Sequence, residues 1–505
     1  MTSTLARTSA GIEPAARPSS DRWRLAAGLG AVGFVVSVAG SWIPSFWGDE
    51  AASVMSAERS LPTLIDMLKN IDAVHGVYYL FLHFWIQVFG ASELSVRLPS
   101  AIAVGFVVAG TFVLGRMLLS RNAGIVAAVI CTVLPRTSYL GADARSYASS
   151  TAIAVWVTIL FLILLRHRFG SVVSRRLAWA GYAVGLAVGI YVFLYLGLLL
   201  VVHGAFLLSS RAGRDHLKEW APAAGVAVVM ALPIVLLGYA QREQIAFLAH
   251  RGYATAQSVV VAQWFGNPFL AAAGWLLLGV AAVAAIGAWR RSPGNPPPVL
   301  LALLWVVLPT LALLGLNAAT PAYNLRYVSF CVPAVALSLA AGIDAVRPRS
   351  ARIALLLLLL VLAAPTDVLQ RGPYAKDAGS DLAQASAILG RQARPGDAVV
   401  FDETTAPRQR PRLALHLYPD DFRGLRDVTL KTPYQARGRL WDTTYPVADV
   451  TARLAPADRV WLVEITGSPD NVRGSALGAL ESEGFEVVST RMAHRTIVYE
   501  LDRRS

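Results

Sequence analysis

Charged residues are scarce in this chain. Only 15% of its 505 residues are Asp, Glu, Lys or Arg, whereas 55% are hydrophobic, and the mean hydropathy is +0.52. Soluble domains carry roughly 25% charged residues. The composition therefore excludes a soluble globular protein and indicates a chain that crosses a membrane several times.

Cysteine is scarcer still, with two residues in the whole sequence. Cys131 and Cys331 both stand in apolar segments. Such a pair excludes a disulfide framework and a cysteine-based metal centre. The sequence also has no tightly spaced set of His, Asp and Glu ligands, so we expect no essential metal and no other required cofactor.

Acidic residues are outnumbered by basic ones, 32 to 45, which gives a net charge of +13. A basic chain can bind nucleic acid through one continuous basic surface. Here the Arg residues instead form short clusters between apolar segments, the pattern that orients membrane proteins. The charge pattern therefore argues against a nucleic-acid partner and for a lipid bilayer.

Apolar runs of the length needed to span a bilayer recur along the chain and predict about eleven transmembrane helices. The expected spans are residues 25–45, 97–119, 122–140, 147–166, 177–192, 194–210, 219–239, 268–289, 299–318, 324–343 and 352–369. Residues 1–24 are expected to form a disordered cytoplasmic N-terminus. The run that follows could be a cleaved signal peptide, but its length favours an uncleaved anchor.

The apolar segment HGVYYLFLHFWIQVFG, residues 75–90, could be a further span or a helix in the membrane interface. Loop charge favours the interfacial helix. If this segment does not span, the Arg clusters all fall on one face, and that face is the cytoplasmic one. We therefore expect a multi-pass cell-membrane protein whose first outer loop, residues 46–96, and whose C-terminal part lie outside the cytoplasm.

Residues 371–505 are less hydrophobic than the rest and alternate helical and strand patterns. A segment of this size and pattern predicts a small extracytoplasmic α/β domain. It contains no Gly-rich phosphate loop and no nucleophile elbow, so no catalytic role is expected of it. Residues 25–370 would form the transmembrane domain.

Polar residues gather on the predicted outer loops. They fall into three groups. The first outer loop has Asp49, Glu50, His75 and Tyr78; the turn after the third span has Arg136, Asp143, Arg145 and Tyr147; the turn before the tenth span has Tyr323, Asn324, Arg326 and Tyr327. A carboxylate can act as general base, Arg binds phosphate bidentately, and Tyr can stack on a sugar ring. The pattern favours group transfer from a phosphate-linked donor.

Simpler interpretations of these residues stay open at this point. Asp49 and Glu50 could belong to a solvated loop, or Asp49 could cap the helix that begins there. The outer Arg and Tyr residues could be interfacial anchors.

Several motifs, taken in order, resemble the GT-C superfamily of membrane glycosyltransferases. Its nearest groups are the protein O-mannosyltransferases, the aminoarabinose transferases and the RgtA/B/C/D-like transferases. The motifs are FWGDEA (46–51), the segment 75–90, SELSVRLPSAIAVG (92–105), ADARSYAS (142–149) and NLRYVSFCVPAVALSLAAGI (324–343). One departure is that Gly76 and Val77 follow His75, where the family often has two prolines.

The resemblance implies a GT-C fold with outer juxtamembrane helices and a role for each matching residue. Asp49 would be the catalytic base, and Glu50 would orient the acceptor or the base. Arg145, Tyr147 and Arg326 would bind the donor phosphate. Weaker substrate contacts would come from His75, Tyr78, Asp143 and Tyr327. Some relatives contain a divalent metal, but none is expected to be essential here.

The resemblance also implies the reaction. A polyprenyl-phosphate sugar, with mannose favoured, would donate its sugar to an acceptor hydroxyl outside the cytoplasm, with inversion of the anomeric carbon. The acceptor would be a cell-wall glycan, a glycolipid or a secreted protein. Two other functions are alternatives: a transporter or flippase of lipid-linked sugars, and a non-catalytic scaffold. Transporters usually have polar residues at the bilayer midplane and repeated halves, and neither is evident in this sequence.

Overall fold

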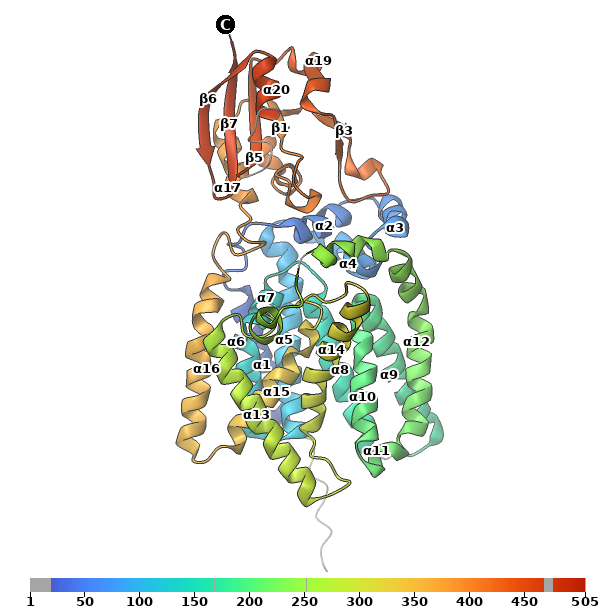
Figure 1. Cartoon of the computed structure of the whole chain (residues 1–505). Helices are drawn as coiled ribbons and strands as arrows, with labels where there is room; N and C mark the ends of the chain where they lie inside the picture. The colour runs from blue at the N-terminus through green and yellow to red at the C-terminus, as the bar shows by residue number, and fades with distance from the viewer. Residues whose placement is uncertain (1–19, 168, 251, 467–475, 505) are drawn as a thin grey trace, which may run out of the picture.

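The computed structural model describes residues 20–167, 169–250, 252–466 and 476–504. It consists of a helical bundle, a layer of short helices at one end of the bundle, and a sheet beyond this layer (Figure 1). Most of the expected disordered segment 1–24 lies outside the described residues.

Each expected span overlaps at least one helix of the bundle. Its helices are α1 (Ser20–Val38), α5 (Glu93–Leu118), α6 (Arg121–Val133), α7 (Pro135–Gly141), α8 (Tyr147–Arg166), α9 (Val172–Val192), α10 (Leu198–Leu208), α11 (Arg211–Asp215), α12 (Leu217–Ala240), α13 (Pro268–Arg291), α14 (Leu300–Ala319), α15 (Val332–Ala345) and α16 (Arg349–Leu369). In the described part of the chain, six helices are long and apolar enough to cross a membrane. The number becomes seven if α6 and α7, bent by 62°, count as one span. The polytopic character is thus confirmed, and the number eleven stays a prediction.

Two spans end elsewhere than the sequence suggested. Helix α1 stops at Val38 rather than at residue 45, because Gly40 has a left-handed φ of 76° that ends the helix. Helix α15 starts only at Val332, so residues 324–328 remain a loop. The expected turn near Phe193 is confirmed: α9 ends at Val192 and a short 3₁₀ helix, Leu194–Gly197, leads into α10.

Small residues allow the bundle helices to approach each other closely. A Cβ atom on Gly30 of α1 would lie 2.8 Å from the carbonyl oxygen of Gly105 on α5. A Cβ on Gly115 of α5 would lie 2.5 Å from the Cα of Gly124 on α6. Glycine at such contacts is typical of membrane helix packing. These contacts fix α1, α5 and α6 side by side. The chain reaches the outer end of the bundle after α1 and after α6, and α5 begins there, directly after the outer layer.

Three short helices form the outer layer: α2 (Gly48–Ala57), α3 (Leu61–Asn70) and α4 (Gly76–Phe89). They lie between the bundle and the sheet (Figure 1), as expected for juxtamembrane helices. Helix α4 exposes large apolar side chains such as Phe84 and Val88 along one side. An exposed apolar side of this kind suits a helix in the membrane interface.

The C-terminal region contains a mixed five-stranded sheet in the order β2-β1-β5-β7-β6. Its strands are β1 (Ala398–Phe401), β2 (Arg426–Asp427), β5 (Arg459–Ile465), β6 (Phe485–Met492) and β7 (Thr496–Arg503), and β3 (Leu430–Thr432) pairs separately with β4 (Thr443–Thr444). The helices of the region are α17 (Leu382–Gln392), α18 (Leu413–Leu417), α19 (Thr451–Leu454) and α20 (Ala476–Ser482). The expected α/β character is confirmed.

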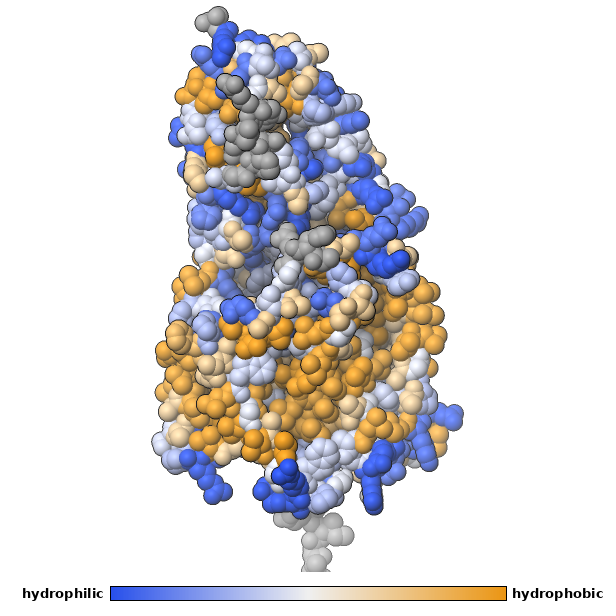
Figure 2. Space-filling model, in the orientation of Figure 1, coloured by the Kyte–Doolittle hydropathy of each residue, from blue (hydrophilic) through white to orange (hydrophobic). Residues whose placement is uncertain are grey.

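Hydropathy divides the surface into zones. Figure 2 shows hydrophobic residues gathered over the bundle and hydrophilic residues over the C-terminal region and at the opposite end of the bundle. Helix α11 and the start of α16, which carry basic residues, lie at that opposite end (Figure 1). The bundle thus presents an apolar belt to lipid, with its basic loops on the side away from the sheet.

Candidate active site

Asp49 lies in the first turn of α2, at the inner side of the outer layer. The helix begins after Trp47, whose backbone is extended and whose side chain makes no capping hydrogen bond. The Asp49 side chain is 17% exposed. It is therefore neither the N-cap residue nor part of a solvated loop, the two simpler interpretations considered for it.

Two arginines from distant parts of the chain hold the Asp49 carboxylate. Arg326 Nη1 lies 2.6 Å from Oδ2, and Arg145 Nη2 lies 3.6 Å from Oδ1. The Arg326 guanidinium also lies over the rings of Trp47, 5.0 Å from the centroid, and Tyr147, at 5.8 Å. The predicted outer loops thus meet at one carboxylate.

The protonation of this cluster follows from its charges. Burial raises the pKa of Asp49, but Arg326 and then Arg145 outweigh burial and hold that pKa below its ordinary value. Burial, followed by Arg145, lowers the pKa of His75 to about 4. At neutral pH the site therefore contains an ionised Asp49, two guanidinium groups and a neutral imidazole.

Tyr79 fixes the position of Arg145. Its hydroxyl donates to Asp72 Oδ2 at 2.8 Å and accepts from Arg145 Nη1 at 2.9 Å. The sequence interpretation chose the neighbouring Tyr78, whose ring is buried among the apolar residues of the outer layer. The spacing of four residues between His75 and Tyr79 was the available signal. His75 ends the 3₁₀ turn that leads directly into α4, so this spacing puts both side chains on the same side; their rings lie 5.8 Å apart.

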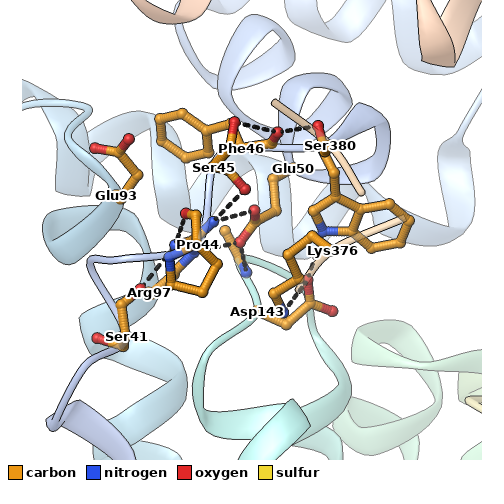
Figure 3. Close-up of polar contacts among 12 residues, drawn as sticks. Ser41, Pro44, Ser45, Phe46, Glu50, Glu93, Arg97, Asp143, Lys376 and Ser380 are labelled. Carbon is orange, nitrogen blue, oxygen red and sulfur yellow. Dashed lines mark hydrogen bonds and ion pairs between the residues drawn. The ribbon is translucent and has the colours of Figure 1, made fainter. Parts of the chain in front are cut away.

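The Glu50 carboxylate is completely buried and faces the Arg97 guanidinium (Figure 3). Arg97 Nε lies 2.7 Å from Glu50 Oε1, and Nη2 lies 2.5 Å from Oε2. The backbone N–H of Ala144 also donates to Oε1 at 3.0 Å. Glu50 thus holds the turn that carries Arg145, and its burial does not favour the expected contact with an acceptor.

Asp143 is buried behind the same turn. Its Oδ1 accepts from Trp47 Nε1 at 3.2 Å and lies 3.8 Å from Lys376 Nζ (Figure 3). Lys376, which the sequence interpretation did not select, comes from the segment that joins α16 to the C-terminal region. This buried pair connects that region to the residues around Asp49.

A cavity of about 420 Å³ opens beside Asp49. It is lined by six of the predicted site residues, namely Asp49, His75, Arg145, Tyr147, Arg326 and Tyr327. One of its walls is aromatic: the rings of Tyr195 and Tyr327 stack at 5.0 Å, and Phe193 lies 6.1 Å from Tyr327. Arg326 and Arg408 also line a second cavity of about 260 Å³. The Asp49 cavity combines cations, one ionised base and an apolar wall, which suits a ligand with a phosphate and a lipid chain.

Among the described residues, no group of three or more His, Cys, Asp or Glu is arranged to hold a metal ion. The expectation that no metal is essential remains a prediction.

One protein family matches part of the chain by sequence. The family model described as dolichyl-phosphate-mannose-protein mannosyltransferase matches residues 76–239. No curated protein matches the chain significantly by sequence.

Solved structures match over nearly the whole chain, at low sequence identity. ArnT from Cupriavidus metallidurans bound to undecaprenyl phosphate aligns with a TM-score of 0.57 at 14% identity, covering 95% of this chain and 98% of that one. The Archaeoglobus fulgidus oligosaccharyltransferase in complex with zinc and sulfate gives 0.51 at 11% identity, covering 93% and 72%. Archaeal AglB from Archaeoglobus fulgidus, in complex with an inhibitory peptide and a dolichol-phosphate, gives 0.50 at 10% identity, covering 95% and 74%.

Proposed function

We propose that this chain, which has the fold of the GT-C membrane glycosyltransferases, moves a sugar from a polyprenyl-phosphate donor to an acceptor hydroxyl outside the cytoplasm. The observation that carries the proposal is the Asp49 carboxylate held between Arg145 and Arg326 at the edge of a cavity with an aromatic wall. Two proteins with the same fold are described with undecaprenyl phosphate and dolichol-phosphate, which supports a lipid phosphate as the ligand.

In the proposed reaction, Arg145 and Arg326 bind the donor phosphate, and the prenyl chain runs along the wall formed by Tyr195 and Tyr327. The acceptor oxygen forms a bond to the anomeric carbon as the bond from that carbon to the phosphate oxygen breaks. The acceptor proton passes to Asp49 as general base. The two guanidinium groups stabilise the negative charge that develops on the leaving phosphate.

A single displacement of this kind inverts the anomeric carbon and needs no protein nucleophile. The charge of the cavity suits an anionic donor, because four arginines but only two aspartates line it. They are Arg145, Arg242, Arg326 and Arg408, with Asp49 and Asp72. Mannose is the favoured sugar, because the matching family model is named for it. A cell-wall glycan, a glycolipid or a secreted protein would supply the hydroxyl.

Transfer from a radiolabelled polyprenyl-phosphate sugar, assayed with purified protein and cell envelopes, tests the proposal. Asp49→Asn keeps the size of the side chain but removes its basicity, so the rate should fall by roughly 10²-fold or more. The control is Asp66→Asn, which changes an exposed carboxylate on α3. Undiminished transfer by Asp49→Asn would remove Asp49 from the chemistry. Donor accumulation in the inner leaflet of cells lacking the protein, without loss of transfer, would favour a flippase.

The proposed orientation places the N-terminus in the cytoplasm and the sheet outside. Its support is that α11 and the start of α16, which carry basic residues, lie at the end of the bundle opposite to the C-terminal region (Figure 1). A reporter enzyme that works only after export should be active when it is fused after Ser505. Activity of a cytoplasm-dependent reporter at that position would reverse the orientation.

A further inference from the structure

The C-terminal region completes the wall of the Asp49 cavity. Two of its segments line the cavity: residues 406–408, in the loop after β1, and Leu440–Trp441, in the loop before β4. The sequence interpretation gave this region no catalytic role. Both segments belong to the C-terminal region, most of which lies beyond the outer layer, away from the bundle (Figure 1).

The first segment is seated on α2 immediately beside Asp49. A Cβ atom on Gly48 would lie 1.9 Å from the carbonyl oxygen of Arg408 and 2.8 Å from the Arg408 Cβ. Only glycine allows this approach of the two backbones. The glycine of the FWGDEA motif therefore brings the 406–408 segment against the first turn of α2.

The second segment is anchored at the other end of α2. Arg59, which is 1% exposed, donates from Nη1 to the carbonyl of Arg437 at 2.8 Å and from Nη2 to that of Arg439 at 2.5 Å. Arg437 Nη1 in turn donates to the carbonyl of Trp441 at 2.9 Å. Buried hydrogen bonds from a guanidinium to carbonyl groups are among the stronger polar contacts in proteins. Both segments are thus fixed relative to Asp49.

Trp441 comes from a different part of the fold than the aromatic wall assigned to the prenyl chain of the donor. The stacked tyrosines of that wall belong to the bundle, whereas Trp441 belongs to the C-terminal region and is only partly buried. An indole ring offers a flat apolar face together with an N–H group. Such a face fits the C–H side of a sugar ring whose hydroxyl groups point sideways.

We propose that Trp441, with the 406–408 segment, forms the acceptor subsite and stacks on the sugar ring of a glycan acceptor. The inference rests on the proposed function, since it assigns the second substrate of the same site. Donor and acceptor then approach Asp49 from opposite sides: the lipid donor from the bundle, and the glycan from the aqueous side through the C-terminal region.

The test uses the full-length protein, a radiolabelled polyprenyl-phosphate mannose, and envelopes of a strain lacking this protein as acceptor. Trp441→Ala should raise the KM for the envelope acceptor roughly tenfold, as expected for loss of a central aromatic contact. Trp441→Phe, which keeps a stacking ring, should stay close to wild type. The control Trp42→Ala removes an exposed tryptophan that lies outside the cavity lining.

Two acceptor-independent readouts separate this subsite from the donor site. Without acceptor, water can take the sugar, giving free sugar and polyprenyl phosphate; that rate and the binding of undecaprenyl phosphate should be unchanged in Trp441→Ala. A changed donor KM or lost undecaprenyl phosphate binding in this variant would assign the wall to the donor and overturn the inference. An unchanged acceptor KM would overturn it as well.

The acceptor class is tested on the envelopes themselves. Periodate, which cleaves vicinal diols of sugars, should abolish acceptor activity, and protease treatment should leave it intact. The reverse pattern would identify a protein acceptor and overturn the inference, while the proposed function would stand. If the wild-type protein transfers nothing and does not hydrolyse the donor, the proposed function itself fails.

Discussion

Asp49 Oδ2 lies 2.6 Å from Arg326 Nη1, so the proposed base and a residue proposed to bind the donor phosphate form an ion pair with each other. Arg145 lies at 3.6 Å on the other carboxylate oxygen. The Asp49 carboxylate is thus paired with the two guanidinium groups that the donor phosphate would bind. Donor binding would exchange one anion for another and release Asp49 for proton transfer.

Asp49→Asn should therefore strengthen donor binding while it abolishes transfer. The neutral amide no longer competes with the phosphate for the two guanidinium groups, and it does not repel the phosphate. We expect undecaprenyl phosphate to bind the purified variant several-fold more tightly, measured by titration in detergent or nanodiscs. Weaker or equal binding would show that the phosphate does not use these arginines.

Arg326→Lys should weaken donor binding although the charge is kept. The ammonium group cannot bind a phosphate through two parallel N–H bonds, and it loses the planar contacts with Trp47 and Tyr147. We expect the donor KM to rise by about tenfold. The matched control is Arg242→Lys, on the exposed rim of the same cavity. Equal effects of the two variants would argue against a particular role for Arg326.

Tyr79→Phe removes one hydroxyl, the bridge between Arg145 and Asp72. The Arg145 side chain then keeps its charge but loses a hydrogen bond that orients it, so the donor KM of the folded protein should rise a few-fold. The loss of a buried hydroxyl should also lower the Tm moderately. Tyr239→Phe, at an exposed position on α12, serves as the control. An effect on kcat alone, with an unchanged donor KM, would contradict the positioning role.

Glu50→Gln tests whether Glu50 is a supporting residue or touches the acceptor. The substitution leaves the Arg97 guanidinium buried without a full counter-charge, which typically costs about 3 kcal/mol or more. We expect a clear fall in the Tm of the detergent-solubilised protein, with an unchanged acceptor KM in the folded fraction. A raised acceptor KM with an unchanged Tm would support the role first expected from the sequence.

The sequence predicted which residues lie close together where the order of the helices alone decides it. Counting spans put the loops of Asp49, Arg145 and Arg326 at one end of the predicted bundle, and the three residues are in contact; their role in a reaction stays a prediction. The sequence interpretation failed to separate neighbours: successive residues of a helix point about 100° apart, so Asp49 and Glu50 cannot both face the cavity. The same geometry distinguishes Tyr78 from Tyr79.

Contacts between regions distant in the chain had no local signal. Arg59 looks like an ordinary loop residue, but it binds carbonyl groups 378 and 380 residues later. Lys376 is likewise an isolated lysine until the fold puts it beside Asp143. The contribution of the C-terminal region to the cavity could be seen only once the domain was seated on α2.

The pH dependence of transfer follows from the exchange of partners at Asp49. With both arginines beside it, the pKa of Asp49 lies below its ordinary value, so the carboxylate stays ionised at a pH where an ordinary Asp takes up a proton. Once the phosphate neutralises the arginines, burial dominates and the pKa rises. The acid limb of kcat, which reports the substrate complex, should therefore lie at higher pH than that of kcat/KM for the donor, which reports the free enzyme. Coincident acid limbs in the two profiles, measured with the same labelled donor, would rule out the release of Asp49 by donor binding.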